Sequence, residues 1–169
     1  MNSAGSRWRP AYVGIGSNLE SPQNQVERAI DALAEIENTV LVRTSSFYRS
    51  APLDGSEHPD YINAVSAILT RLDAGSLLGS LQEIERAQGR TRGAEKWAPR
   101  TLDLDLLVYS SASIDEKDLK VPHPGIGERN FVLLPLLDIA PHLSIPGRGS
   151  VRELAAAADT SNPRIEKLA

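Results

Sequence analysis

Two aspartates separated by one residue are the strongest chemical feature of this sequence. Asp103 and Asp105 fall in the alternating stretch Leu-Asp-Leu-Asp-Leu at 102–106, which is typical of a β-strand. Because alternate residues of a strand share a face, both carboxylates point the same way, with Cβ atoms about 7 Å apart. A cation usually offsets the repulsion of such a pair, and oxygen ligands favour Mg²⁺ or Mn²⁺. The pattern predicts a metal site; the alternative is a solvated strand face with each aspartate paired to a surface arginine.

A basic segment precedes the two aspartates. Residues 86–100 contain one acidic side chain, Glu95, and five basic ones: Arg86, Arg90, Arg92, Lys96 and Arg100. An arginine guanidinium binds phosphate oxygens in pairs. A cationic loop that runs into a carboxylate pair suits a Mg–polyphosphate, with metal ligands on one side and arginines on the other. A solvated basic loop would explain the charges but not their position.

No glycine-rich phosphate loop competes with this site. Gly14 and Gly16 follow a predicted strand, but the position three beyond Gly16 is Leu19, so the dinucleotide-binding fingerprint fails. The sequence also has no Gly-Lys-Ser/Thr. We interpret the two glycines as places where a helix and a strand pack closely. Any ATP is therefore expected to be held by metal and arginines.

His123 is a further candidate, fixed between Pro122 and Pro124. Its imidazole suits contact with a phosphate or a leaving oxygen, although a lone histidine is more often structural.

A pocket for a flat ring is suggested by aromatic and amide side chains. Tyr61 and Asn63 share one face of a predicted strand, while Trp97 and Phe131 lie in two polar segments. Aromatic rings stack on flat ligands, and an amide reads a donor–acceptor edge. Packing in the core is the alternative, and it is weakest for Trp97.

Periodicity and turn signals indicate the elements that must position these residues. Ser21 is expected to cap the first helix, with Pro22 at its first position, and Asp73 is expected to cap a second helix that ends at Gly89. We expect strands at 11–15, 40–48, 61–70 and 102–109, loops at 50–60 and 90–100, and short helices near 130–138 and 150–158.

The order of these elements predicts a ferredoxin-like α+β fold. Its βαββαβ core has an antiparallel sheet with helices packed on one face, followed by C-terminal additions. Residues 1–9 are expected to form a loose tail and residues 10–169 a single domain. The fold alone defines no function.

Composition narrows the functional classes. The chain has 169 residues, a net charge of −4 and no cysteine. An acidic protein is a poor general binder of nucleic acid or membrane surfaces, and the lack of cysteine excludes disulfides, thiolate metal sites and cysteine nucleophiles. The longest apolar stretch, 131–140, is far shorter than the ~20 residues that cross a bilayer. We expect a cytoplasmic protein without nucleic-acid or membrane partners.

From Tyr12 to about Ile145 the chain resembles the 6-hydroxymethyl-7,8-dihydropterin pyrophosphokinase family. The main similarity is the run Lys-Trp-Ala-Pro-Arg-Thr-Leu-Asp-Leu-Asp-Leu-Leu at 96–107. Further blocks follow the family order: Gly-Ser-Asn-Leu at 16–19, Ser-Phe-Tyr-Arg at 46–49, Pro-Asp-Tyr-Ile-Asn-Ala at 59–64, Gln-Gly-Arg at 88–90 and Val-Pro-His at 121–123.

The resemblance implies an ATP-dependent diphosphotransferase of folate biosynthesis. Such an enzyme moves pyrophosphate from ATP to the hydroxymethyl group of 6-hydroxymethyl-7,8-dihydropterin, giving AMP and the dihydropterin pyrophosphate. Two Mg²⁺ ions would bind between ATP and Asp103 and Asp105, while Arg92 and Arg100 would stabilise charge on the transferred group. The resemblance assigns ATP binding to Gln82, Glu85, Arg90, Arg92, Arg100, His123 and Arg129. It assigns pterin binding to Ser50, Ala51, Leu53, Tyr61, Asn63, Trp97 and Phe131. A monomer is expected.

The sequence departs from the family pattern at several places. Ser50-Ala51 stands where relatives carry Thr-Pro, and Ala98 replaces a frequent glycine.

Two other functions are compatible with the same elements. A non-catalytic ferredoxin-like module that binds a ligand or RNA would need, for RNA, exposed aromatics on its central strands and a basic surface. A Mg²⁺-dependent kinase that transfers only the γ-phosphoryl group is distinguished from a pyrophosphokinase by the resemblance alone.

Overall fold

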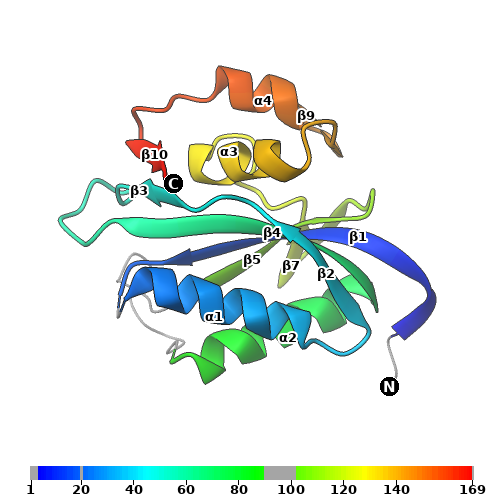
Figure 1. Ribbon diagram of the computed structural model, residues 1–169. Helices are drawn as coiled ribbons and strands as arrows, with labels where there is room; N and C mark the ends of the chain where they lie inside the picture. The colour runs from blue at the N-terminus through cyan, green and yellow to red at the C-terminus, as the bar shows by residue number, and fades with distance from the viewer. Residues whose placement is uncertain (1–3, 20, 90–101, 169) are drawn as a thin grey trace.

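An antiparallel sheet separates two helical layers in the computed structural model (Figure 1). The structure describes residues 4–19, 21–89 and 102–168, and within these ranges six strands form the sheet. Their spatial order is β10-β3-β4-β1-β5, and β2 also pairs with β4. The strands are β1 (Ala4–Ser17), β2 (Thr39–Thr44), β3 (Tyr48–Ser50), β4 (Tyr61–Leu72), β5 (Asp103–Tyr109) and β10 (Ile165–Lys167).

One face of the sheet is covered by α1 (Pro22–Ala34) and α2 (Ala74–Ala87), as Figure 1 shows. Each helix buries an apolar stripe, with Val26 and Leu33 on α1 and Leu77 and Leu81 on α2 fully buried. They pack against the strand residues that face the same way: Ala11, Val13, Ile15, Ile62, Ala64, Ile68, Leu104 and Leu106. This is the main core, and it leaves the opposite sheet face for other elements.

The C-terminal part of the chain covers the opposite face (Figure 1). There α3 (Asn130–Ile139) and α4 (Val151–Ala157) join Val65, Leu107 and Val108 of the sheet in a second buried cluster. The short hairpin of β8 (Ser144–Ile145) with β9 (Gly149–Ser150) completes this side. A second hairpin, β6 (Ile114–Glu116) with β7 (Leu119–Val121), instead packs Ile114, Leu119 and Val121 against the main core. The predicted ferredoxin-like α+β core with C-terminal additions is confirmed.

A β-bulge in β5 reverses the alternation of faces, so residues after the bulge face the opposite core from the one expected for a regular strand. Leu106 pairs with Val13 and Val108 pairs with Tyr12, so Leu107 is the extra residue. Leu106 therefore lies in the core under α1 and α2, while Leu107 and Val108 lie in the cluster under α3. The carbonyl of Leu107 accepts a hydrogen bond from the backbone N–H of His123 at 2.9 Å. The bulge thereby ties His123 to the strand that carries the two aspartates.

The structure corrects one prediction about the N-terminal tail and one about a strand. The expected loose tail at 1–9 is wrong for residues 4–9, because β1 begins at Ala4, which pairs with Leu72 of the long strand β4. The predicted strand 40–48 is two strands, β2 and β3. Ser45 interrupts them because its hydroxyl accepts from the Val65 N–H at 2.9 Å.

The two predicted helix caps have different outcomes. Asp73 caps α2, since its carboxylate accepts from the Ser76 N–H at 2.8 Å. The prediction for Ser21 is wrong: its backbone has φ 60° and its side chain makes no capping bond to α1. In the left-handed conformation the hydroxyl is not directed at the first N–H groups of the helix, as an extended capping residue would direct it.

No helix in the described parts of the chain is both long and apolar enough to cross a membrane.

Asp73→Ala is expected to lower the free energy of unfolding by about 1 kcal/mol, because α2 loses a capping acceptor. Ser21→Ala at the equivalent position of α1 is the matched control and should change stability by less than about 0.5 kcal/mol. Urea denaturation followed by circular dichroism measures both. Equal losses in the two variants would contradict the assignment of the caps.

Candidate active site

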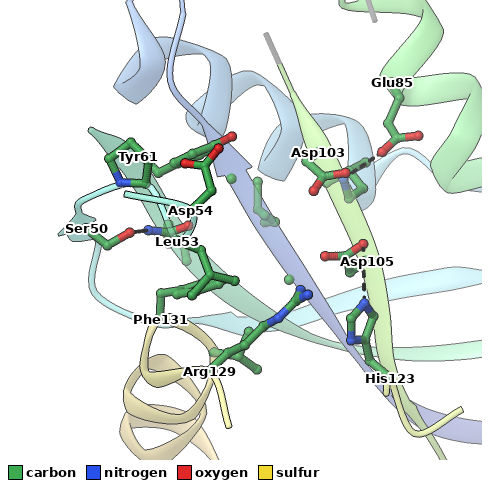
Figure 2. Close-up of a pocket in the computed structure, with 18 of the residues that line it drawn as sticks. Ser50, Leu53, Asp54, Tyr61, Glu85, Asp103, Asp105, His123, Arg129 and Phe131 are labelled. Carbon is green, nitrogen blue, oxygen red and sulfur yellow. Dashed lines mark hydrogen bonds and ion pairs between the residues drawn. The ribbon is translucent and has the colours of Figure 1, made fainter. Parts of the chain in front are cut away.

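A cavity of about 380 Å³ opens over the ends of β4, β1 and β5, and Leu78, Gln82 and Glu85 of α2 line it beside β5. Figure 2 shows Asp103, Asp105 and His123 along one wall and Ser50, Leu53 and Tyr61 along the other. Arg129 and Phe131 reach into it from the start of α3. The cavity therefore brings together segments that are more than 100 residues apart in the chain, such as Gly14 and Val132.

Strand register builds the floor of this cavity. Gly16 of β1 lies directly opposite Asn63 of β4 on one side and Asp103 of β5 on the other. Directly paired residues of an antiparallel sheet point to the same face. The three positions thus form one row, in which the middle position has no side chain. With strands about 4.8 Å apart, the glycine leaves a gap of about 10 Å between the backbones that carry Asn63 and Asp103.

The two glycines have a different role from the one we inferred from sequence. Gly14 and Gly16 both line the cavity, on the sheet face away from α1. A Cβ at Gly16 would lie 3.2 Å from the Asn63 Oδ1, and one at Gly14 would lie 3.4 Å from the Leu107 side chain. The close approach of the Asn63 amide beside the cavity, and not helix packing, explains the glycine at position 16.

The aspartates share a face as predicted, and both line the cavity with partly buried side chains. Glu85 of α2 holds the start of their strand. Its side chain is 3% exposed, and its Oε2 accepts from the backbone N–H of Leu104 at 2.8 Å. Glu85, which the resemblance assigns to ATP binding, thus also fixes the backbone between the two carboxylates.

His123 lies beside the carboxylate pair. Its Nε2 is 3.9 Å from the Asp105 Oδ1, and its Nδ1 accepts from the Gly125 N–H at 3.1 Å. Burial, with the Arg129 cation as a second cause, lowers the pKa of His123 to about 4 against the opposing effect of Asp103. The imidazole is therefore neutral at pH 7. Because Nδ1 accepts, the proton sits on Nε2, which is a donor directed toward the carboxylates.

Arg129 supplies positive charge from the opposite layer. Its guanidinium passes directly over Gly125, where an added Cβ would lie 2.5 Å from the Arg129 Nε. It also stacks over the ring of Phe131, 5.8 Å from the centroid. This geometry directs Arg129 into the cavity, as Figure 2 shows.

The far wall has the character expected for a heteroaromatic ring. The Asn63 amide donates to the Ser50 Oγ at 2.8 Å, and both side chains are buried. This bond fixes the amide, so its oxygen faces the floor at Gly16. Ala51, Leu53, Tyr61 and Phe131 supply the apolar surface around it.

A second cavity of about 260 Å³ continues beyond Asp105 and His123. It shares Leu78 and Leu104 with the first cavity and is bordered by β7 and the residues before it, including Lys117 and Lys120. The carboxylate–histidine wall therefore lies between two hollows.

The structure gathers most of the predicted site residues. Those that line the first cavity are Ser50, Ala51, Leu53, Tyr61, Asn63, Gln82, Glu85, Asp103, Asp105, His123, Arg129 and Phe131. Four predicted residues, Arg90, Arg92, Trp97 and Arg100, lie outside the described residues. Sequence reasoning missed several lining residues: Pro52, Asp54, Ser56, His58, Leu78 and Val132. Asp54, Ser56 and His58 had a signal, since they fall in the turn-rich loop, but their direction depends on tertiary structure.

These features place a carboxylate pair, a histidine and an arginine opposite a buried amide and apolar side chains in one cavity. Comparisons with known proteins identify the family. Residues 12–141 match the family model described as 7,8-dihydro-6-hydroxymethylpterin-pyrophosphokinase. The chain belongs to this family.

Individual relatives are also named as pyrophosphokinases of a hydroxymethyl dihydropterin. The 2-amino-4-hydroxy-6-hydroxymethyldihydropteridine pyrophosphokinase of Haemophilus influenzae is 45% identical over 144 residues, which cover 85% of this chain and 89% of that protein. The enzyme of the same name from Pseudomonas aeruginosa is 44% identical over 146 residues, covering 86% of this chain and 90% of that protein.

Solved structures show the same fold. A Plasmodium falciparum HPPK-DHPS crystal structure with pterin and p-hydroxybenzoate superposes on 89% of this chain with a TM-score of 0.69 at 14% identity. This chain spans 43% of that chain, so the likeness concerns one part of a longer protein.

Glu85→Ala is expected to lower the free energy of unfolding by about 1–3 kcal/mol, because the buried N–H of Leu104 loses its acceptor. Glu85→Gln keeps an acceptor oxygen and should lose less than half as much. Chemical denaturation of the two variants measures the difference. Equal destabilisation by Gln and Ala would show that the hydrogen bond to Leu104 is not what Glu85 contributes.

Proposed function

We propose that this chain transfers pyrophosphate from ATP to the hydroxymethyl group of 6-hydroxymethyl-7,8-dihydropterin, with AMP as the second product. The observation that carries the proposal is the row Asn63–Gly16–Asp103. It sets a ring-reading amide and a metal-binding carboxylate on one face, with an open glycine floor between them. A pterin beside Asn63 would thus direct its hydroxymethyl arm along the floor toward the carboxylates.

Mg²⁺ fits the donors that the structure provides. Among the described residues, no three His, Cys, Asp or Glu side chains converge on a common metal position. Mg²⁺ typically binds one or two protein carboxylates and takes its other ligands from water and substrate phosphates. Asp103 and Asp105 would hold two such ions, which neutralise charge on the polyphosphate as it transfers. The closest nitrogen base, His123, is neutral and directs an N–H toward this region.

The protein's own groups chiefly orient the reactants. In-line attack of the substrate hydroxyl on the β-phosphorus of ATP forms the new P–O bond as the bond to AMP breaks. The guanidinium of Arg129 and the Nε2–H of His123 donate to phosphate oxygens in a cavity partly shielded from water. Arg90, Arg92 and Arg100 belong to the same proposal, with Arg92 and Arg100 stabilising charge on the transferred group, and Trp97 covers the pterin face opposite Phe131.

The two hollows divide the substrates. The pterin occupies the wall formed by Ser50, Asn63 and Phe131, and the polyphosphate crosses the carboxylate–histidine wall. The nucleoside then extends into the second cavity, beside Leu78 and Lys120.

We further infer that residues 10–169 act as one catalytic domain, as a cytoplasmic monomer without nucleic-acid or membrane partners. The RNA-binding alternative is not favoured, because the C-terminal helices cover part of the sheet face it would need.

Incubation with ATP, Mg²⁺ and 6-hydroxymethyl-7,8-dihydropterin is expected to yield AMP in a 1:1 ratio with the pterin pyrophosphate. The nucleotide product is identified by ion-pair chromatography and the pterin product by mass. Omission of either pterin or metal should abolish AMP formation. ADP as the product would instead establish γ-phosphoryl transfer on the same scaffold, and no nucleotide product from folded protein would indicate a binding module.

Asp103→Asn is expected to reduce turnover by about 10³-fold or more, because a metal ligand loses its charge while its shape is kept. The circular dichroism spectrum should be unchanged, since the side chain lines an open cavity. Mn²⁺ binding in the presence of an ATP analogue, followed by electron paramagnetic resonance, should weaken in parallel.

Asp31→Asn, an exposed aspartate of α1 on the opposite side of the sheet, is the control and should leave both readouts unchanged. Near-normal turnover or Mn²⁺ binding in Asp103→Asn would refute the metal assignment.

A further inference from the structure

The last ten described residues lie outside the family match and pack behind one wall of the cavity. That match ends at residue 141, whereas residues 159–168, here called the C-terminal strap, run along the outer edge of the sheet. Its strand β10 pairs with β3, with Ile165 opposite Ser50 and Lys167 opposite Tyr48. The strap therefore continues the sheet directly behind Ser50, whose hydroxyl orients the Asn63 amide.

Backbone and side-chain contacts attach the strap to both ends of the loop 51–60. At its start, the Ala51 N–H donates to the Arg164 carbonyl at 2.9 Å. At its end, the Arg164 guanidinium lies 3.3 Å from the Asp60 carboxylate, and Asn18 donates from the inner side to the Pro59 carbonyl at 3.2 Å. The loop end is thus held mainly by Asn18, because the Arg164 side chain is 74% exposed in its ion pair, while Ala51 is held through the strap. Between these ends lie Leu53, Asp54 and Ser56, which line the cavity.

Asn130 connects the strap to the opposite wall. Its amide donates to the carbonyls of Asp159 and Pro163, each at 2.8 Å, and the residue is 1% exposed. It lies in the chain between Arg129 and Phe131, which both line the cavity. Its Oδ1 is buried without a partner among the described residues, which is costly for a polar atom. The contribution of the amide at this position is therefore its two hydrogen bonds to the strap.

We propose that the C-terminal strap positions the pterin-side wall of the cavity, with Asn130 as the positioning residue that sets this wall against Phe131. The inference rests on the proposed function and specifies which part of the chain controls affinity for the pterin. The ring is held between a loop attached to β3 and the Phe131 side chain of α3. The strap contacts this loop at Ala51 and α3 at Asn130, next to Phe131. Neither Asn130 nor the strap contacts a reacting atom.

The backbone pairing, and not the surface charges of the strap, provides the attachment. Glu166 pairs with Arg49 at 2.9 Å and Lys167 with Asp138 at 3.2 Å, but these ion pairs are largely exposed. Exposed pairs contribute little. A change that removes a strand N–H at residue 166 should therefore act differently from one that removes only its carboxylate.

Glu166→Pro and Glu166→Ala form the matched test. Proline removes the N–H at the centre of the three-residue strand, whereas alanine removes only the ion pair and keeps the backbone. Glu166→Pro should raise the KM for the pterin about tenfold while the KM for ATP and kcat stay within about twofold. Hydrogen exchange should show loss of protection at the Ala51 amide. Glu166→Ala should match the wild type in all four quantities.

Asn130→Ala provides an independent test from the α3 side. It should raise the dissociation constant of the pterin, measured by pterin fluorescence with a non-hydrolysable ATP analogue, by about tenfold. Thr39→Val controls for general loss of stability. It removes a buried hydrogen bond of 2.8 Å to Thr70 at the far end of the sheet, and it should leave pterin binding unchanged.

Three results would overturn the inference. The first is an unchanged pterin KM in Glu166→Pro although the Ala51 amide exchanges freely, and the second is an Ala51 amide that stays protected. The third is an equal loss of pterin and ATP affinity that follows the melting temperature in every variant, Thr39→Val included. Wild-type protein that forms no AMP from the pterin would instead reject the proposed function itself.

Discussion

The register of β1 between β4 and β5 is the constraint on which the site depends. This central strand places Gly16 opposite both Asn63 and Asp103, and Gly14 opposite Asp105. A shift of β1 by one residue would turn Gly14 and Gly16 into the core and put side chains in their place between β4 and β5, because successive strand residues alternate between faces. Ala11, Val13 and Ile15 prevent that shift, since their burial under α1 and α2 fixes which face of the strand looks inward. The same apolar contacts that stabilise the fold therefore align the chemical groups above it.

Charge is distributed so that each wall favours a different part of the ligand pair. The Asp103–Asp105 wall concentrates negative charge that a divalent cation would offset. Arg129, directed into the cavity over Gly125, meets it from the α3 layer. His123 stays neutral beside them because burial and the Arg129 cation lower its pKa, so it donates through Nε2 without adding charge. On the opposite wall the buried Asn63 amide is fixed by Ser50, and the Asp54 carboxylate lines the cavity from the loop. Such a division suits a polyphosphate on one side and an uncharged ring on the other.

Local signals predicted most of the fold, and they failed where tertiary contacts decided. The helical stripe of Val26 and Leu33 and the Asp73 cap lie within single elements, so the sequence was sufficient. The break at Ser45 was not predictable, because it depends on a hydrogen bond from Val65, twenty residues away. Ser21 likewise is a residue type that caps helices, but its backbone has φ 60° and its side chain makes no capping bond. Residues 4–9 look like a polar tail, yet β4 is long enough to pair with Ala4.

By itself, the sequence determined the order of elements, the shared face of Asp103 and Asp105 and the family to which the chain belongs. Alternation and helical periodicity are properties of neighbours along the chain, and motif blocks are read directly from their order. Only the tertiary structure decided that Gly16 is an open floor, that the Leu107 bulge sets His123 beside Asp105, and that the C-terminal strap lies behind Ser50. Each of these depends on contacts between segments far apart in sequence, and those contacts follow from packing two cores on opposite faces of one sheet.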